Sequence, residues 1–250
     1  MKYLLLLTAF LAMQAGVVQA DYEATEKKLQ AAMSAEVRSE RERARDRNRR
    51  PVETLAFFGL RDNMKVVELI PGGGWYTKLL APVLADRGEL IVALGTDRVE
   101  KNVLTQPGFE KVTVTGKGSE LYRPEGSRFY ELKVAGFNVK RADMVLTFRN
   151  YHNFNEAGRR AMNKLAYDAL KKGGIYGVVD HTQRHMEPDN PENRRRIDPV
   201  LTIKEIQEAG FELVDFSDLH YRPDDELRYE VGRRSVTGNS DRFTLMFKKK

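Results

Sequence analysis

The feature that most constrains the fold of this chain is a run of three glycines, Gly72 to Gly74, between an apolar segment and a helix-like one. The preceding stretch, Lys65 to Ile70 (KVVELI), has the pattern of a buried strand, and Trp75 to Ala85 has that of a helix. Glycine lets the backbone turn sharply and approach a ligand where a Cβ would collide. The first N–H groups of the following helix attract anions. The run therefore predicts a strand–turn–helix unit of a parallel sheet with a ligand site at its turn.

The rest of the chain continues this alternation of strands and helices. Six further segments have the composition of strands: Glu89–Leu94, Lys111–Thr115, Ala142–Thr147, Ile175–Val179, Phe211–Phe216 and Arg242–Phe247. Helices are expected at Pro51–Phe58, at Glu156–Lys172 closed by Gly173-Gly174, and at Pro199–Ala209. The last two strands have no helix between them, which indicates an antiparallel hairpin at the edge of an otherwise parallel sheet. The prediction is a seven-stranded, mostly parallel α/β sheet. Residues 97–137 are the part whose secondary structure the sequence indicates least clearly.

The composition excludes several kinds of chemistry. The 250 residues include no cysteine, which rules out disulfides, thiolate metal sites and cysteine nucleophiles. The four histidines are too scattered to suggest a metal cluster, so no metal is expected. The formal charge of +6 makes the surface mildly basic, well short of a histone-like surface.

The first twenty residues have the pattern of a cleaved signal peptide. Lys2 provides a positive charge, Leu4 to Met13 is apolar, and Val18-Gln19-Ala20 places small residues at a cleavage site. The apolar run is too short to span a bilayer as a permanent helix, and a buried N-terminal helix is the alternative. The sequence predicts an exported protein, periplasmic or secreted, whose mature chain begins at Asp21 and has no membrane segment after cleavage.

The mature chain is expected to consist of a charged helical extension, residues 21–50, and one domain, residues 51–250. Seven arginines lie from Arg38 to Arg50, interleaved with acidic residues. Mixed charge of this kind is typical of a solvated helix with i,i+4 ion pairs. An arm that binds anions or nucleic acid is the alternative, and the interleaved acids argue against it.

Three kinds of glycine turn compete for the Gly72–Gly74 segment. The first is a tight turn without a ligand. A dinucleotide such as NAD needs the pattern G-x-G-x-x-G, in which Gly72 and Gly74 fit but Thr77 stands in the third position. The third kind is an S-adenosylmethionine loop, which carries an acid just upstream of its glycines, and Glu68 supplies that acid. A Walker loop is excluded, because no Gly-Lys-Ser or Gly-Lys-Thr follows.

The stretch from Glu68 to Thr77 resembles motif I of class I S-adenosylmethionine-dependent methyltransferases. More narrowly, the chain resembles a family of predicted exported bacterial methyltransferases. The motifs that carry this resemblance are Arg43–Glu53 (RARDRNRRPVE), Pro71–Thr77 (PGGGWYT), Arg149–Phe154 (RNYHNF), Asp180-His181 and Gly238–Phe243 (GNSDRF). They are spread over nearly the whole mature chain. The resemblance implies a Rossmann-like methyltransferase sheet that uses S-adenosylmethionine as its cofactor.

The resemblance also implies cofactor contacts for residues that follow three of the strands. At the glycine loop these residues are Glu68, Pro71, Gly72, Gly73, Gly74, Tyr76 and Thr77. Asn150 and Tyr151 follow the strand Ala142–Thr147 and are expected to line the cofactor through a backbone carbonyl or the ring. Strand two usually ends with an acid for the ribose hydroxyls. Gly95 stands in that slot, and Asp97, two residues on, is expected to take the role.

Two histidines are candidates for the chemistry. Methyl transfer from a sulfonium needs positioning of the reactants, and a base where the acceptor must lose a proton. His152 and His181 follow the fourth and fifth strands, near the expected methyl group, and histidine titrates near neutral pH. Structural hydrogen bonding within a loop is the alternative role for each.

The expected partner is a small-molecule substrate of acidic character. Arg149, Arg184 and Arg194–Arg196 follow the same two strands, where arginines would attract a carboxylate or phosphate. The stretch 184–196 is either a solvated loop or a lid over the pocket. The Asn-Pro-Pro-Tyr loop of amino-group DNA methyltransferases is replaced by Arg149-Asn150-Tyr151-His152, which disfavours nucleic acid. The alternative functions are a non-catalytic small-molecule binder on the same fold and an NAD-dependent oxidoreductase.

Overall fold

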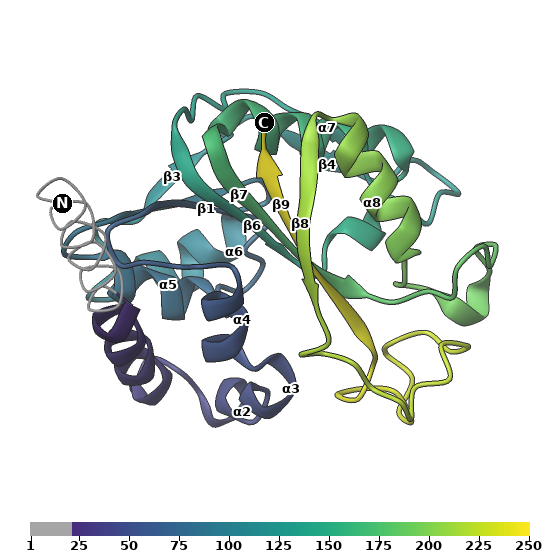
Figure 1. Cartoon of the computed structure of the whole chain (residues 1–250), viewed down its shortest axis with the longest axis horizontal. Coiled ribbons are helices and arrows are strands. Elements are labelled where there is room, and N and C mark those ends of the chain that lie inside the picture. The colour runs from purple at the N-terminus through teal and green to yellow at the C-terminus, as the bar shows by residue number, and fades with distance from the viewer. Residues whose placement is uncertain (1–21) are drawn as a thin grey trace, which may run out of the picture.

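A computed structural model describes residues 22–250 (Figure 1), so the predicted signal peptide, residues 1–20, lies outside the described residues. The predicted seven-stranded sheet is confirmed, and its strand order is β3-β2-β1-β6-β7-β9-β8. Its strands are β1 (Lys65–Leu69), β2 (Glu89–Ala93), β3 (Thr113–Thr115), β6 (Ala142–Phe148), β7 (Leu170–His181), β8 (Phe211–Ser217) and β9 (Arg242–Lys249).

The predicted antiparallel hairpin is also confirmed, and its two strands are placed in a specific order. The strands from β3 to β7 pair in parallel. β9 pairs antiparallel with both β7 and β8, as in the partners Val178–Leu245 and Leu213–Phe247. The last strand of the chain therefore lies inside the sheet, and β8, which runs in the direction of the parallel strands, forms the edge.

Helices cover both faces of this sheet. They are a helix over residues 22–34 and α2 (Glu40–Arg43), α3 (Asp46–Arg49), α4 (Pro51–Phe57), α5 (Thr77–Leu84), α6 (Asp97–Val99), α7 (Glu156–Ala169) and α8 (Pro199–Glu208). Single turns of other helix types lie at η1 (Glu100–Leu104), η2 (Tyr151–Asn153) and η3 (Pro191–Asn193). The segment that the sequence left least legible contains α6, η1, β3 and a separate two-stranded sheet, β4 (Glu120–Tyr122) with β5 (Glu131–Lys133).

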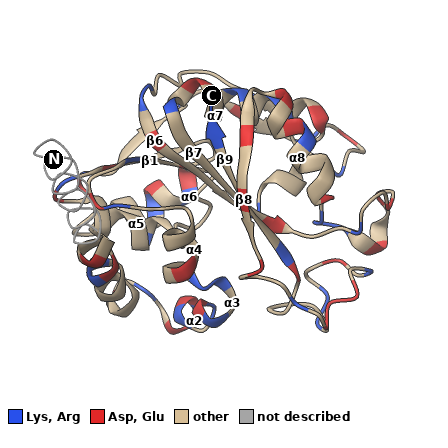
Figure 2. Ribbon diagram, viewed as in Figure 1, with Lys and Arg blue, Asp and Glu red and all other residues tan. Residues whose placement is uncertain are grey.

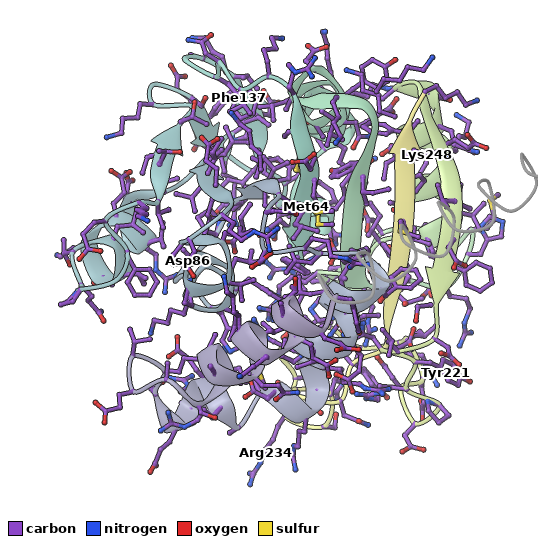
Figure 3. All side chains as sticks on the ribbon, turned by 60° about the vertical axis from the view of Figure 1, so that its left-hand side comes forward. Met64, Asp86, Phe137, Tyr221, Arg234 and Lys248 are labelled. Atoms are coloured by element: carbon purple, nitrogen blue, oxygen red, sulfur yellow. The ribbon has the colours of Figure 1, made fainter. Side chains whose placement is uncertain are left out.

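The apolar core forms two clusters, one for each face of the sheet. Residues from the N-terminal helix, α4, α5 and η1 share one cluster, in which Leu29, Leu55 and Leu79 are buried. Met64, whose sulfur is visible in the interior in Figure 3, packs against the same cluster. Residues from α7 and α8 share the other cluster, for example Met162. Burying both faces of the sheet stabilises the fold by about 25 cal/mol for each Å² of apolar surface removed from water.

The end of α7 differs from the prediction. The helix begins as expected, because the side chain of Asn155 caps it by accepting a hydrogen bond from the N–H of Gly158. It ends at Ala169, before the predicted Gly173-Gly174 stop. The next residue, Leu170, is buried, extended and paired with Ala142 of β6. Both glycines therefore lie inside β7, because burial of Leu170 against β6 begins the strand earlier than the glycines indicate.

The charged extension is not the solvated helix that its composition predicts. Residues 35–39 interrupt it, and Ser39 begins the new helix α2 with a capping box to Glu42. Arg50, with a left-handed backbone (φ 39°), then separates α3 from α4. Arg38 and Arg49 are buried, which a mixed-charge sequence does not reveal. The extension lies against the sheet's helical layer because Leu29 and Ala32 contribute to its core.

The extension and the β8–β9 connection meet at the carboxyl ends of the parallel strands. In Figures 1 and 2, α2, α3 and the connection 218–241 lie at the lower end of the molecule, where basic residues alternate with acidic ones along the ribbon. His220 joins the two segments: its Nδ1 lies 2.7 Å from the Thr244 hydroxyl and its Nε2 lies 2.9 Å from the carbonyl oxygen of Arg49. Within residues 22–250, no helix combines the length and the apolar character needed to cross a membrane.

Candidate functional site

The three glycines of the turn have different structural roles. Gly72 and Gly74 both have a left-handed backbone, with φ of 57° and 79°. A Cβ on Gly74 would lie 2.8 Å from a methyl group of Val103, so this glycine permits close packing against η1. A Cβ on Gly72 would meet nothing within 4 Å, because Gly72 borders an open cavity. The turn is therefore packed tightly on one side and open to a ligand on the other.

The strand ends around this turn are held in an unusual backbone conformation. Ile70, Leu94 and Arg149 directly follow β1, β2 and β6, and their φ angles are 54°, 66° and 62°. A β-branched residue such as Ile70 rarely adopts positive φ. Asn150 holds it there, because its Nδ2 donates to the carbonyl oxygen of Ile70 at 3.2 Å. Such strain persists only where surrounding contacts enforce it, and it is concentrated at functional sites.

A cavity of about 570 Å³, which we call the glycine-loop cavity, lies beside the turn. Its volume is within the range of small-molecule sites. Six of the residues that the sequence predicts for cofactor binding line it: Glu68, Pro71, Gly72, Gly73, Tyr76 and Asn150. They come from the ends of β1 and β6 and from the turn itself, so the parallel sheet brings them to one edge.

Glu68 has a special electrostatic position in this cavity. Its carboxyl is buried and accepts a hydrogen bond from the Thr77 hydroxyl at 2.6 Å. Burial raises the pKa of Glu68 to about 7, although the Thr77 hydrogen bond and the nearby Arg49 charge both lower it. The carboxyl of Glu68 therefore titrates near neutral pH.

Four of the predicted cofactor residues do not line the cavity. Gly74 packs against Val103 of η1, and the hydroxyl of Thr77 donates its hydrogen bond to Glu68. Tyr151 is fully buried, where its hydroxyl donates to Glu205 at 2.8 Å and accepts from Asn163 at 2.8 Å. Asp97 is exposed at the start of α6, and its neighbour Arg98 lines the cavity instead. The side chain of Tyr151 is thus a core contact and leaves none of its polar atoms for a ligand.

The charged extension forms one wall of the glycine-loop cavity and is held against Trp75. The indole N–H donates to the carbonyl oxygen of Glu42 at 3.1 Å, and the guanidinium of Arg49 lies 4.2 Å from the centroid of the ring. Lys78 adds an ion pair to the Glu42 carboxylate at 2.9 Å. A cation above an indole contributes about 0.5–2 kcal/mol. Sequence reasoning missed Arg49 and Trp75, because nothing local signals that they meet.

A second cavity of about 480 Å³, which we call the arginine cavity, lies next to the first. Both predicted catalytic histidines, His152 and His181, line it. Its arginines are Arg45, Arg49, Arg149, Arg195 and Arg242, of which the first three also line the glycine-loop cavity. The two cavities therefore adjoin, and a ligand in one reaches residues that border the other.

The two histidines differ in their hydrogen-bond partners. The Nδ1 of His152 lies 2.5 Å from the carboxylate of Asp180, which also accepts from the backbone N–H groups of His152 and His181. His181 instead places its Nδ1 3.0 Å from the hydroxyl of Ser240. Burial, together with nearby cations of which Arg242 is the strongest, holds the pKa of His181 well below its usual range. Of the two histidines, only His152 has a carboxylate partner, which fixes the tautomer of its ring.

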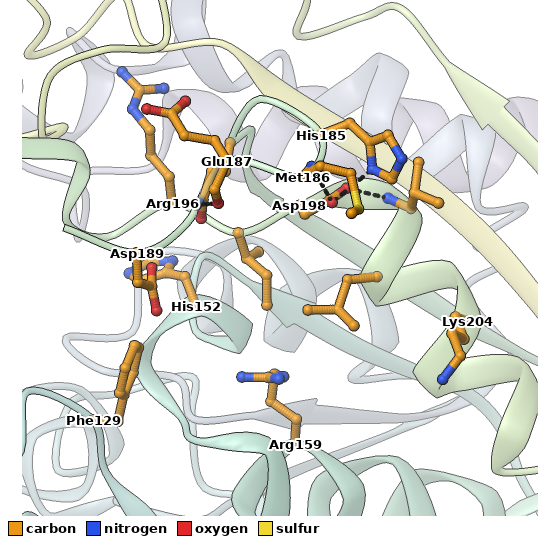
Figure 4. A pocket seen from close by; sticks show the side chains of 14 residues that line it. Phe129, His152, Arg159, His185, Met186, Glu187, Asp189, Arg196, Asp198 and Lys204 are labelled. Carbon is orange, nitrogen blue, oxygen red and sulfur yellow. Dashed lines mark hydrogen bonds and ion pairs between the residues drawn. The ribbon is translucent and has the colours of Figure 1, made fainter.

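A third cavity of about 410 Å³, the outer cavity, is also lined by His152 (Figure 4). It lies between α8 and the stretch 182–198, and Phe129, Met186 and Ile197 contribute to its lining. In the close-up, the ring of His185 and the backbone N–H of Met186 both reach the carboxylate of Asp198, at 2.8 and 3.1 Å.

The five arginines that the sequence assigns to an acidic acceptor lie in different places. Arg194 is exposed and lines none of the three cavities. Arg149 and Arg195 line the arginine cavity. Arg196 is buried in an ion pair with Asp225 at 2.9 Å, and Arg184 donates to the carbonyl oxygen of Glu226 at 3.1 Å. The stretch 184–196 is therefore tied to the β8–β9 connection, and one of its arginines reaches the cavity. No group of three or more potential metal-binding His, Asp or Glu side chains occurs among residues 22–250.

No protein-family model matches the sequence, and neither does any curated protein. Solved structures do match. A SAM dependent methyltransferase from Aquifex aeolicus superimposes with a TM-score of 0.55 and 13% identity, over 82% of this chain and 92% of that chain. The (4+2)-cyclase SpnF superimposes with a TM-score of 0.55 and 14% identity, over 81% of this chain and 80% of that chain. The glycopeptide N-methyltransferase MtfA complexed with sinefungin superimposes with a TM-score of 0.51 and 16% identity, over 79% of this chain and 84% of that chain.

These similarities, together with the strand order and the inserted last strand, define the fold. It is the fold of class I S-adenosylmethionine-dependent methyltransferases. At this level of identity the likeness concerns the arrangement of the backbone. One of the matching structures is named for cyclisation, so the reaction of this chain has to be argued from its own residues.

The raised pKa of Glu68 leads to a prediction about stability and pH. Between pH 4.5 and about 7 the folded carboxyl keeps a proton that the unfolded chain loses, so stability falls as the pH rises through that window. At about 1.4 kcal/mol for each unit, the loss amounts to roughly 3 kcal/mol. In Glu68→Gln this loss is absent. As the pH rises from 4.5 to 8, the free energy of unfolding, measured in urea, should therefore fall by about 3 kcal/mol less in the variant than in the unaltered protein.

The matched control for this experiment is Glu212→Gln, which removes an exposed carboxylate from β8. Its difference from the unaltered protein should stay nearly constant over the same window. A constant difference for Glu68→Gln as well would show that the buried carboxyl titrates normally, and the assignment of its charge would be wrong.

Proposed function

We propose that this chain is an S-adenosylmethionine-dependent methyltransferase that acts on a small anionic acceptor. The observation that carries the proposal is the adjacency of the two cavities. The glycine-loop cavity has the predicted cofactor residues, the arginine cavity has the His152–Asp180 pair, and Arg49 and Arg149 line both. A methyl donor in the first cavity and an acceptor in the second would meet at these shared residues.

The glycine-loop cavity fits the cofactor at the turn. The open side of Gly72 leaves room where a Cβ would stand, and Glu68 and Asn150 offer polar atoms beside it. When bound, S-adenosylmethionine supplies an electrophilic methyl group carried on a sulfonium. The exposed Asp97 does not line the cavity, and Arg98 does, so the expected ribose contact would come from a different residue. Support for this cofactor includes the fold and the matching MtfA structure, which is complexed with sinefungin.

His152 is the residue that would remove a proton from the acceptor. Because Asp180 accepts from Nδ1, the neutral ring carries its free lone pair on Nε2. His152 lines the arginine cavity, so a protonated nucleophile there has a base beside it. The Asp180 carboxylate then stabilises the imidazolium that forms. Proton removal by a positioned base is worth about 10²- to 10⁴-fold in rate.

The acidic character of the acceptor rests on the residues that surround it. Arg149 and Arg195 line the arginine cavity, as the sequence predicts, and no carboxylate joins them in its lining. The volume of about 480 Å³ suits a metabolite better than a protein segment or nucleic acid. Guanidinium groups bind carboxylates and phosphates through paired, charge-assisted hydrogen bonds.

The first test is cofactor binding by titration calorimetry. We expect S-adenosylmethionine and S-adenosylhomocysteine to bind and NAD to give no heat. Gly72→Val should abolish this binding, because its side chain would fill the open side of the turn. Gly126→Val is the matched control, since Gly126 also has positive φ (73°) and nothing within 4 Å of its Cβ position, but lines none of the three cavities. Binding of NAD in place of the two methyl-transfer ligands would favour the oxidoreductase.

The second test separates the two histidines once methyl transfer is detected, for example with a radiolabelled methyl group and a metabolite extract. His152→Gln should lower the turnover rate by 100-fold or more, because the base is lost. His181→Gln should lower it by less than tenfold, because burial already disfavours proton uptake by this ring. Cofactor affinity should stay nearly the same in both. Equal losses would assign the chemistry to the pair as a whole, and cofactor binding without any transfer would favour the non-catalytic binder.

We also propose that the protein is exported. The proposal rests on the N-terminal pattern, a positive residue followed by the apolar run Leu4 to Met13 and small residues up to Ala20. The cofactor is made in the cytoplasm, so an exported enzyme has to obtain it across a membrane. The mass of the protein isolated from the exported fraction should correspond to a chain that starts at Asp21. A full-length mass in the cytoplasmic fraction would contradict export.

A further inference from the structure

The buried arginines of this protein fall into two kinds. Five arginine side chains are buried among residues 22–250. Three of them have a carboxylate partner: Arg38 pairs with Asp46, Arg159 with Glu205, and Arg196 with Asp225. The other two, Arg49 and Arg242, form no ion pair with a described carboxylate, and both line the arginine cavity. A buried cation without a counter-charge is costly to maintain.

Arg149 completes this unneutralised group, which we call the arginine cluster: Arg49, Arg149 and Arg242. It has no ion pair among the described residues either, and it lines the same cavity. The two other arginines of the cavity differ, because Arg195 is paired with Glu230 and Arg45 is exposed. The cluster therefore places three positive charges on the wall of one cavity whose lining includes no Asp or Glu.

Neutral contacts hold two members of the arginine cluster, Arg49 and Arg242, in place. Arg49 stacks on Trp75, and the Nη1 of Arg242 donates to the carbonyl oxygen of Asn48 at 3.0 Å. The Nε of Arg242 is buried and has no hydrogen-bond partner in the protein. These contacts fix the direction of the guanidinium groups without cancelling their charge, so donors remain available for a ligand.

The electrostatics agree with an absent counter-charge. Burial, followed by the charge of Arg149, lowers the pKa of Arg49 to about 9 and that of Arg242 to about 10. The charge of Asp180 raises the pKa of Arg242 and of Arg149, but as a lesser cause than burial, which lowers both. Asp180 is engaged by His152 and His181, and Glu68, whose carboxyl is half-protonated near pH 7, faces the other cavity. An anion in the arginine cavity would relieve the mutual repulsion of the three cations.

We propose that the arginine cluster binds a compact dianion of phosphate-monoester chemistry, which is the anionic end of the methyl acceptor. A single carboxylate would neutralise one of the three cations. A phosphate monoester carries −1.5 to −2 charges and three strong acceptor oxygens at neutral pH. Its oxygens match the three guanidinium groups in number, and its charge neutralises more of the cluster than one carboxylate does. The part of this inference that concerns the acceptor rests on the proposed methyl transfer, whereas the dianion site stands on the cluster itself.

Trp75 offers a direct probe for this site, because it is the only tryptophan of the chain and Arg49 lies on its ring. Inorganic phosphate titrated into the full protein at constant ionic strength should change the Trp75 fluorescence saturably, with a matching heat in calorimetry. Arg242→Gln should weaken this binding by about 10- to 100-fold, the range expected for a charge-assisted hydrogen bond. S-adenosylhomocysteine affinity should stay unchanged, because Arg242 lines only the arginine cavity.

The controls separate this site from general attraction of anions. Arg234→Gln removes the same charge from an exposed position of the β8–β9 connection (Figure 3) and should leave phosphate binding unchanged. If Arg242→Gln does not fold, as judged by circular dichroism, Arg149→Gln repeats the phosphate titration alone, because Arg149 also lines the glycine-loop cavity. Equal weakening by Arg234→Gln, or no saturable phosphate binding by the unaltered protein, would overturn the inference. Succinate binding as tightly as phosphate would overturn the phosphate class.

Two further comparisons decide the source of the dianion and the link to methyl transfer. Glycerol 3-phosphate should bind more tightly than inorganic phosphate, because an ester extends into the rest of the cavity. The reverse order would assign the site to the free ion and overturn the acceptor role. Phosphate binding without S-adenosylhomocysteine binding would leave the dianion site standing and remove the proposed function. Cofactor binding without phosphate binding would remove the dianion site alone.

Discussion

The stacking of Arg49 on Trp75 is the contact on which the site depends most. Trp75 directly follows the glycine turn, and Arg49 lies near the end of the charged extension, so this contact joins two parts of the chain that are separate in the sequence. The carbonyl oxygen of Arg49 also accepts from His220 of the β8–β9 connection. One residue therefore anchors the extension, contacts the turn and lines both cavities. Without it, the cavities would lose part of their common wall, which Arg45 and Arg149 also line.

The positive and negative charges of the site do not balance one another, and this imbalance sets what the site can bind. The carboxyl of Glu68 is kept near its titration point by burial, while the arginine cluster carries charge without a partner. Asp180 supports His152 and at the same time ties the turn that follows β6 to β7, because its carboxylate also accepts from the backbone N–H of His152. A methyltransferase sheet supplies only the edge on which such residues meet. The matching structures share that sheet with this chain and are named for different reactions.

The sequence was most informative where the signal is local. Glu68, Gly72 and Asn150 were identified from a strand, a glycine run and a second strand end, and the cavity lies there. The sequence was less informative about whether a side chain points into the core or towards the cavity. Tyr151 and His152 are neighbours on one turn, yet Tyr151 enters the core towards Glu205 while His152 faces the cavity. Asp97 and Arg98 divide in the same way, with the arginine on the cavity side.

By itself the sequence determined the alternation of strands and helices, the glycine turn and the place of the last two strands, because these depend on patterns within short stretches of chain. Only the tertiary structure decided which arginines are solvated and which are buried. Arg49, Arg149 and Arg242 are far apart in the chain, and they meet because three separate segments pack at the same ends of the strands. Burial and missing counter-charges depend on that packing, and composition alone, which describes the extension as evenly mixed in charge, does not contain them.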